Sequence, residues 1–410
     1  MKILIVNSHE SEGGAARAAL RLHNSLLNEK IDCSLLVQKK QSNRIDVLSE
    51  EGLIKKNFNL IRPILDLIPT RFYKGKDLSL FSPSLLPLSG IVDRINQINP
   101  DIVHFHWICG GMIKIEDISK ITAPIVWTLH DNWAFTGGCH IKGSCEKHKE
   151  SCGACPRLQS NNKNDLSSKI WKRKMKTFSS ISSLTIIGLS NWLNNLSKES
   201  SLFKDRKHFQ LPNPIDCDVY KKIDKNRAKE LWGLPQDKKI IVFGAMNISD
   251  GRKGYNQLKE AIDKITSEDV EVLVFGSSRR LDELNSKIKF HYLGFLYDDI
   301  SMVTLYNAAD VTIVPSLEEN LSNVIMESLS CGTPVVGFDI GGNSDLIEHK
   351  KTGYLAEKMN SEDLARGIDW VLQNDNYNKI STNSRQKVLN NFESSLVAKK
   401  YIALYKDLLS

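Results

Sequence analysis

The chain has 410 residues, of which 41% are apolar and 25% are charged, as is typical of a globular protein with two or three domains. No run of about 18 apolar residues occurs, which excludes a membrane-spanning helix. Because a strand is expected from Lys2 onward, we expect no signal peptide and a cytoplasmic protein. The net charge of +7 does not by itself choose between nucleic acid, anionic lipid and phosphorylated ligands.

The first half of the chain predicts a series of strand and helix units. Residues 2–7 (KILIVN) predict a strand, which a loop connects to a helix from about Ala15 to Leu27. Gly13 and Gly14 would let the backbone approach a ligand at the start of this helix, although a simple tight turn explains the pair equally well. The further strands lack strict alternation, as expected of parallel strands covered on both faces: residues 33–38, 102–107, 125–130 and 184–190.

Two basic clusters, residues 53–76 and 169–178, stand out in this half. In the first, apolar residues follow helical spacing with lysines and arginines between them, a pattern of helices that lie on a membrane surface. An amphipathic helix that buries its apolar side against its own domain is the alternative. Pro63 and Pro69 interrupt any long helix in this region.

Histidines mark two of the predicted strands. His104 and His106 alternate along one strand, so both side chains should project to the same face. They could line a cleft or satisfy hydrogen bonds in the core. His130 ends the next strand and is followed by Asp131, and a histidine at a strand end can be structural or functional.

Four of the eight cysteines cluster after His130, at Cys139, Cys145, Cys152 and Cys155. The last two form a C-x-x-C, and two histidines lie nearby, which fits a structural zinc site whose ligands are four cysteines, or three cysteines and one histidine. The spacing is irregular for a zinc ribbon, so reduced or disulfide-bonded cysteines remain alternatives. In a reducing cytosol, disulfides are disfavoured.

Two prolines and Asn213 in residues 208–220 break regular structure and predict a linker between domains. A second series of strands and helices follows: a strand at 239–244, a helix from Tyr255 to about Ile265, a strand near 270–275 and a helix near 300–307. Residues 384–409 are helical by pattern. We therefore predict domains at residues 1–208 and 209–391.

The most informative segment is residues 315–336, PSLEENLSNVIMESLSCGTPVV. A buried strand at 309–315 is followed by a helix that should start near Leu321 or Ser322, so Glu319 precedes the helix and Glu327 lies within it. The unpaired N–H groups at such a helix start can bind a phosphate or a sugar hydroxyl, and ionised carboxylates accept hydrogen bonds from vicinal hydroxyls. Two ordinary solvated carboxylates are the alternative for this spacing alone.

The whole segment resembles the signature of retaining glycosyltransferases of family 4. The resemblance continues upstream, where Gly244 closes a strand and Arg252-Lys253-Gly254 opens a helix, and downstream in residues 341–357 (GGNSDLIEHKKTGYLAE). It implies an α/β protein of the GT-B fold, with two Rossmann-like doubly wound domains facing a central cleft. The first would bind the acceptor and the second the nucleotide sugar, and a C-terminal helix of about residues 392–410 would pack back on the first domain.

The resemblance also implies roles for individual residues. Glu319 and His130 would act at the reacting sugar, and Glu327 would hold the ribose. Lys253, with Arg252 beside it, is the clearest candidate for neutralising the leaving diphosphate, because a cation can stabilise that charge. His106 and Asp131 would lie on the acceptor side. The remaining candidates for donor binding are Gly14, Asn320, Leu321 and Ser322.

The sequence departs from the family pattern in three places. Ala245-Met246 stands where typical members carry an arginine, so Arg252 would have to substitute. The usual glycine-rich EGFG reads EENLS, which is similar to a bacterial exopolysaccharide subgroup of the colanic-acid type, and Asp345 replaces a common glutamate. The loop after His130 (DNWAFTGGCH and CGACP) also resembles the corresponding region of that subgroup, and it would form a wall of the acceptor site.

We therefore expect a hexosyltransferase that moves a sugar from a UDP- or GDP-sugar to a saccharide or an undecaprenyl-diphosphate-linked acceptor in bacterial surface polysaccharide synthesis. Asp216-Cys217-Asp218 has the D-x-D pattern of a metal-binding site but lies in the linker. We therefore expect metal-independent catalysis, with zinc at most structural. Peripheral association with the inner membrane and no nucleic-acid partner are also expected. The alternatives are a sugar-nucleotide epimerase of the same fold and a zinc-containing nucleic-acid-binding protein, which leaves the two glutamates unexplained.

Overall fold

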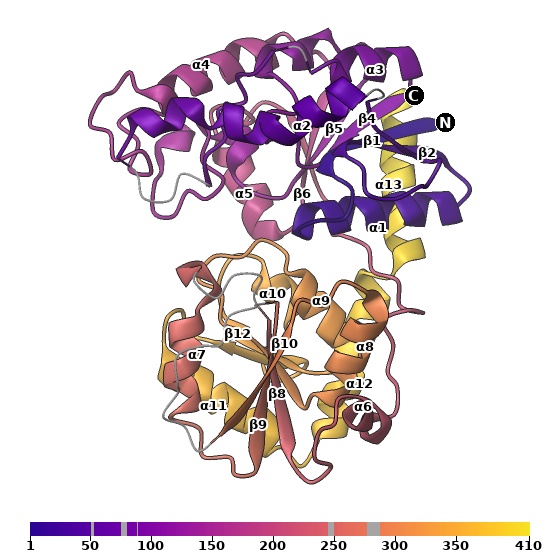
Figure 1. Ribbon diagram of the computed structural model, residues 1–410, viewed down its shortest axis with the longest axis vertical. Helices are drawn as coiled ribbons and strands as arrows, with labels where there is room; N and C mark the ends of the chain where they lie inside the picture. The colour runs from indigo at the N-terminus through magenta and orange to yellow at the C-terminus, as the bar shows by residue number, and fades with distance from the viewer. Residues whose placement is uncertain (51–52, 75–79, 88, 245–249, 277–287) are drawn as a thin grey trace. The chain divides into compact units, whose positions relative to one another are not determined.

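The computed structural model describes residues 1–50, 53–74, 80–87, 89–244, 250–276 and 288–410 (Figure 1). The chain forms two compact units. The first contains Met1–Pro214 together with Val397–Ser410, and the second contains Ile215–Leu396. Among the described residues, no helix is long and apolar enough to cross a membrane.

The first unit is built on a parallel sheet of seven described strands in the order β3-β2-β1-β4-β5-β6-β7. Its central strands consist mainly of apolar residues and are buried on both faces, as expected for parallel strands between helix layers. The strands are β1 (Lys2–His9), β2 (Asp32–Lys39), β3 (Val47–Leu48), β4 (Ile102–Phe105), β5 (Ile125–Leu129), β6 (Leu184–Gly188) and β7 (Lys207–Gln210).

The helices of this unit cover both faces of the sheet. One layer includes α13, whose Val397, Tyr401 and Tyr405 belong to the same hydrophobic core as α1 and the strands β1 and β2. The α-helices are α1 (Gly14–Asn28), α2 (Leu53–Asp66), α3 (Ile91–Ile98), α4 (Leu166–Ser179), α5 (Asn191–Glu199) and α13 (Ser394–Leu409). Short 3-10 helices are η1 (Ile68–Phe72), η3 (Ile115–Lys120), η4 (Trp133–Phe135) and η5 (Lys147–Lys149).

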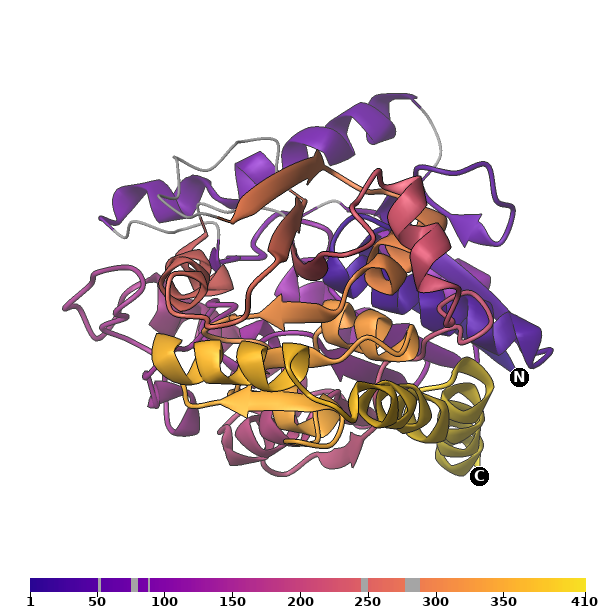
Figure 2. The same ribbon diagram turned by 90° about the horizontal axis from the view of Figure 1, so that it is seen from below.

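The second unit has a parallel sheet of six described strands in the order β10-β9-β8-β11-β12-β13. Helices α7 and α11 pack on one face, and α8, α9 and α12 cover the other (Figures 1 and 2). The strands are β8 (Lys239–Gly244), β9 (Val270–Phe275), β10 (Lys289–Gly294), β11 (Val311–Val314), β12 (Val335–Phe338) and β13 (Gly353–Ala356). The helices are α6 (Lys225–Leu231), η6 (Gly251–Lys253), α7 (Tyr255–Ile262), α8 (Asp299–Ala308), α9 (Asn323–Ser330), α10 (Asn343–Leu346), α11 (Ser361–Leu372) and α12 (Tyr377–Asn391).

Each unit is therefore a doubly wound, Rossmann-like α/β domain, which confirms the predicted fold class. In each sheet the strand order reverses once, between β1 and β4 in the first unit and between β8 and β11 in the second. Ligands of such domains bind beyond the carboxyl ends of the strands at this reversal. The loops after these strands are therefore the places to examine for a site.

The structure changes two of the predicted boundaries. The division between the units follows Pro214 rather than residue 208, because β7 pairs with β6 and keeps residues 207–210 in the first sheet. Residues 384–409 do not form one helix: α12 ends at Asn391 and α13 begins at Ser394. The break occurs because the Glu393 carboxylate accepts the N–H groups of Ser395 (3.0 Å) and Leu396 (2.9 Å) and so caps a new helix.

Candidate active site

An ion pair between Lys253 and Glu319 lies beyond the reversal point of the second sheet. Lys253 follows β8 and Glu319 follows β11, and Lys253 Nζ lies 3.0 Å from Glu319 Oε2. The side chains are 36% and 20% exposed, so both can still reach a ligand. The negative charge of Glu319 raises the pKa of Lys253, which keeps the lysine cationic at neutral pH.

Two glycines allow the loops that carry this pair to pack closely. Gly254 has φ +69°, and a Cβ there would lie 1.7 Å from the carbonyl oxygen of Pro315. Gly341 has φ +53°, and its Cβ would lie 1.8 Å from the carbonyl oxygen of Glu319. Leu317 N–H also donates to the carbonyl of Arg252 at 2.7 Å. The loops after β8, β11 and β12 therefore form one assembly around the Lys253–Glu319 pair.

Helix α9 begins directly after the Glu319 loop. Its first residue is Asn323, and Ser322 is its N-cap, whose side chain accepts the N–H of Ile325 at 3.5 Å. The predicted donor-binding residues Asn320, Leu321 and Ser322 thus lie at this helix start. The side chains of Leu321 and Ser322 are buried in the unit, which leaves the backbone as the part of these residues suited to contact a ligand.

Glu327 lies in the middle of α9 and is buried. The hydroxyl of Tyr306 donates to Glu327 Oε2 at 3.0 Å. Burial and the neighbouring Glu327 raise the pKa of Tyr306 well above its ordinary value, so this phenol stays protonated and donates. Tyr306 therefore helps to position the Glu327 carboxylate, and the role of Glu327 in ribose binding stays a prediction.

The second candidate cation has an internal partner. Arg252 Nε donates to Asp250 Oδ1 at 2.9 Å, and Arg252 Nη2 to Asp250 Oδ2 at 2.5 Å. Lys253 points instead to Glu319, so the two adjacent cations face different carboxylates. Ala245 and Met246, where the family pattern has an arginine, lie outside the described residues.

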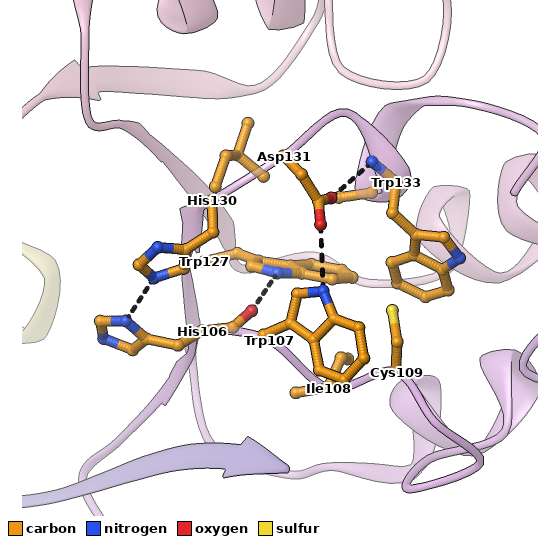
Figure 3. A pocket seen from close by; sticks show the side chains of 10 residues that line it. His106, Trp107, Ile108, Cys109, Trp127, His130, Asp131 and Trp133 are labelled. Carbon is orange, nitrogen blue, oxygen red and sulfur yellow. Dashed lines mark hydrogen bonds between the residues drawn. The ribbon is translucent and has the colours of Figure 1, made fainter. Parts of the chain in front are cut away.

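The first unit has a pocket beyond the ends of β4 and β5 (Figure 3). His106 and His130 meet at its edge, where a hydrogen bond of 2.8 Å joins His106 Nδ1 and His130 Nε2. Asp131 accepts hydrogen bonds from Trp107 Nε1 (3.0 Å) and the backbone N–H of Trp133 (2.8 Å). The lining residues are His106, Trp107, Ile108, Cys109, Trp127, Leu129, His130, Asp131, Trp133 and Ala134.

The protonation of the pocket follows from burial and from His140. Burial lowers the pKa of His130 to about 4 and that of His106 well below its ordinary value, so both imidazoles are neutral near pH 7. Burial alone would raise the pKa of Asp131, but His140 Nδ1 lies 2.7 Å from Asp131 Oδ2, and the pKa of Asp131 is lowered on balance. The pocket therefore holds one carboxylate and two neutral histidines.

His104 projects to the same face of β4 as His106, as predicted, with the two ring centroids 4.6 Å apart. It belongs to the core, however, because it hydrogen-bonds to the Tyr405 hydroxyl of α13 and to the Thr128 hydroxyl, both at 2.7 Å. Of the two alternatives for these histidines, His104 takes the structural one and His106 lines the pocket.

Lys174 of α4 is a residue that the sequence interpretation missed. Its side chain is buried under the pocket loop, where Nζ lies 3.6 Å from the Trp133 ring centroid and donates to the carbonyls of Trp133 and Thr136. Burial lowers its pKa to about 7. The sequence contains a sign of this burial, because Lys174 follows Leu166 and Ile170 at intervals of four residues and so lies on the same buried face of the helix.

The predicted zinc ligands Cys139, Cys145, Cys152 and Cys155 are free thiols in the structure. Among the described residues, which include all four, no three histidine, cysteine or carboxylate side chains are grouped to hold a metal ion. Cys152 Sγ instead accepts the N–H of Gly137 at 3.1 Å.

Gly14 is the first residue of α1, and a Cβ on the neighbouring Gly13 would meet nothing within 4 Å.

Residues 224–387 match the family of glycosyl transferases group 1. An uncharacterized glycosyltransferase of Methanocaldococcus jannaschii is 26% identical over 349 residues, covering 77% of this chain and 86% of the relative. The putative colanic acid biosynthesis glycosyl transferase WcaC of Escherichia coli K12 is 24% identical over 355 residues, with 82% of each chain covered.

Solved structures share the two-domain architecture. A glycosyltransferase from Rickettsia africae has a TM-score of 0.70 at 19% identity and covers 100% of this chain and 99% of its own. Anabaena HepE in complex with UDP-glucose has a TM-score of 0.69 at 16% identity, with coverage of 99% and 100%. This likeness shows the fold, which is that of GT-B glycosyltransferases. The second unit thus carries a glycosyl transferases group 1 domain, and the chain is a glycosyltransferase.

Proposed function

We propose that this glycosyltransferase belongs to the retaining family 4 and moves a hexosyl group from a nucleotide sugar to a saccharide or lipid-linked oligosaccharide of a bacterial surface polysaccharide, such as capsule, O-antigen or exopolysaccharide. The observation that carries this proposal is the Lys253–Glu319 pair beyond the sheet reversal of the second unit. A cation and a carboxylate at that point match the two ends of a sugar diphosphate, because the diphosphate is anionic and the sugar offers hydroxyl donors.

In this proposal Lys253 binds the diphosphate and stabilises the charge that develops when it leaves. Glu319 accepts hydrogen bonds from sugar hydroxyls, and the backbone of residues 320–322 contacts the sugar or phosphate at the start of α9. Glu327 holds the ribose. Arg252, next to Lys253 in the sequence and held by Asp250 with Nε 2.9 Å from Oδ1, is the second cation on the phosphate side in this proposal.

The acceptor and the active-site histidine are assigned to the first unit. His130 and His106 are neutral and joined to each other, so they offer imidazole nitrogens as hydrogen-bonding groups to a sugar without adding charge. Asp131 is held in place by three hydrogen bonds and supplies the carboxylate of this pocket. In a retaining reaction the leaving phosphate itself can take the acceptor proton, so we assign no carboxylate nucleophile and no catalytic metal.

The relatives support the substrate classes in this proposal. Anabaena HepE has been solved with UDP-glucose, which supports a UDP-sugar donor, with a GDP-sugar as the other choice. The relatives named for colanic acid and capsular polysaccharide synthesis support an acceptor of the surface-polysaccharide class. An acceptor carried on undecaprenyl diphosphate would lie at a membrane, and we propose that the protein works at the cytoplasmic face of the inner membrane.

The test is to incubate the protein with UDP- and GDP-sugars and with undecaprenyl-diphosphate-linked saccharides, and to analyse the products by mass spectrometry. The proposal predicts a free nucleoside diphosphate together with an acceptor heavier by one hexose. The anomeric coupling constant of the product in NMR then tests retention. An isomerised nucleotide sugar with no glycosidic product would contradict the proposal and indicate an epimerase.

A further inference from the structure

Helix α2 lies at the surface of the first unit (Figure 1). Six apolar side chains of α2 and η1 are exposed there. Phe72 is 85% exposed, Leu60 59% and Ile64 58%, which is unusual for side chains of this size. We call this surface the apolar ridge, and its members are Phe58, Leu60, Ile61, Ile64, Ile68 and Phe72. The alternative interpretation of this sequence segment, a helix that buries its apolar side against its own domain, is therefore wrong for these residues.

The ridge is not a loosely packed segment, because the opposite side of α2 is anchored by two buried charges. Arg62 Nε donates to the carbonyl of Gly111 at 2.6 Å, and its Nη1 donates to that of Pro87 at 3.1 Å. The Asp66 carboxylate accepts the N–H groups of Ser84 (3.1 Å) and Leu85 (3.0 Å). Within residues 58–66 the polar side chains of Asn59, Arg62 and Asp66 are thus buried, whereas four apolar side chains are exposed: Phe58, Leu60, Ile61 and Ile64.

The exposed charged side chains within residues 58–74 are basic. In residues 58–74 the one carboxylate, Asp66, is buried, whereas Arg71 and Lys74 are exposed. The Tyr73 hydroxyl accepts the N–H of Leu166 at 2.8 Å, which joins the end of the ridge to the start of α4. Helix α4 has no acidic residue and exposes three lysines, Lys169, Lys172 and Lys176. The hydrogen bond between Tyr73 and Leu166 places the end of the first basic cluster next to the start of the helix that carries the second.

We propose that the apolar ridge inserts into the headgroup region of an anionic lipid bilayer, with Arg71, Lys74 and the lysines of α4 contacting the lipid phosphates. Exposed apolar side chains flanked by basic ones are what an interfacial helix needs, because apolar burial and attraction to anionic lipid act together. A second copy of the chain would bring the same positive charges against these, which disfavours self-association through the ridge. This inference rests on the membrane-linked acceptor proposed above and names the surface that meets the membrane.

The test is flotation of the purified protein with vesicles of phosphatidylcholine alone or with phosphatidylglycerol added. We expect wild type to float with the anionic vesicles, and Ile64→Asp combined with Phe72→Asp to lower the bound fraction on the order of tenfold or more. Arg71→Glu combined with Lys74→Glu should weaken the preference for anionic vesicles, since only the α4 lysines would then contact the phosphates. Ile45→Asp is the matched control, because Ile45 is 93% exposed in the same unit but lies off the ridge, and it should bind as wild type does.

Failure of wild type to float, or equal flotation of the Ile64 and Phe72 double variant, would overturn the inference. Light scattering without vesicles tests the alternative partner, which is a second copy of the chain. A dimer that Ile64→Asp abolishes would show that the ridge binds a second copy. Stabilisation by nucleotide sugars is measured in vesicle-free solution and should be the same in wild type and in the ridge variants. The proposal for the donor site and the proposal for the membrane surface can therefore be contradicted independently.

Discussion

The carboxylate of Glu319 lies 3.0 Å from Lys253 Nζ. Replacing it therefore removes both a candidate hydrogen-bond acceptor for sugar hydroxyls and the ion-pair partner of Lys253. We expect Glu319→Gln, which keeps the shape but not the charge, to lower transfer by about 10²-fold or more, the usual cost of removing one electrostatic contact to a transition state. Steady-state kinetics measure this loss. Glu318→Ala, at the neighbouring carboxylate, is the control and should retain most activity. Full activity in a well-folded Glu319→Gln protein would remove Glu319 from the mechanism.

His130 is predicted to act as a neutral imidazole. Burial places its pKa at about 4, so the ring loses its proton well below neutral pH and does not titrate between pH 6 and 8. The pH profile of kcat/KM should therefore show no step near pH 6.5 that belongs to His130. His130→Gln should lower activity without changing the shape of that profile. A step near pH 6.5 that is present in wild type and absent in His130→Gln would contradict this assignment.

At the scale of elements, Lys174 connects α4 to the loop that carries Asp131 and Trp133. Its folded pKa of about 7 lies below its ordinary value of 10.5, so the unfolded chain binds more protons between these values and stability should rise with pH in that window. From pH 6 to pH 9 wild type should gain roughly 2–3 kcal/mol in free energy of unfolding that Lys174→Met does not gain. Chemical denaturation at several pH values measures the difference.

Lys176→Met, at an exposed lysine of the same helix, is the control for this comparison and should follow the wild-type pH dependence. Parallel stability curves for wild type and Lys174→Met would show that Lys174 stays charged in the folded protein. Its two carbonyl acceptors, Trp133 and Thr136, would then compensate for the loss of solvation.

The elements that the sequence predicted well are the ones with continuous apolar runs. Residues such as Ile240 and Ile313 are fully buried in β8 and β11, and their pattern is that of covered parallel strands. Strand β7 was missed because three of its four residues, KHFQ, are polar and none is fully buried at the sheet edge. The helix break at Glu393 was missed because it depends on a side chain that caps α13.

The candidate site shows the same limit. Sequence placed Lys253 and Glu319 on separate loops, but their 3.0 Å contact depends on the order of the strands and on the close approach that Gly254 and Gly341 permit. The sequence grouped Lys174 with the basic cluster of residues 169–178, because charge patterning does not reveal which lysine of a helix faces inward. The cysteine spacing suggested a metal site, yet among the described residues no such group forms.

At the scale of the whole molecule, each Rossmann-like unit is assigned one ligand class, and the first unit is also assigned a lipid surface. Each unit has its own hydrophobic core, and the Lys253–Glu319 pair lies wholly within the second unit. Donor binding should therefore be detectable without an acceptor or a membrane. A ligand at 100 times its Kd stabilises the folded protein by about 2.7 kcal/mol, enough to measure as a shift in Tm.

The most direct test of the central claim is the thermal stability of the purified protein across a panel of UDP-, GDP-, ADP- and dTDP-sugars. We predict that Tm rises with one nucleotide class and that Lys253→Ala loses this rise, whereas Lys259→Ala, at a lysine of the following helix α7, retains it. A rise that is the same in wild type and in Lys253→Ala would contradict the site. Absence of a rise with every nucleotide sugar would contradict a preformed donor site in the second unit.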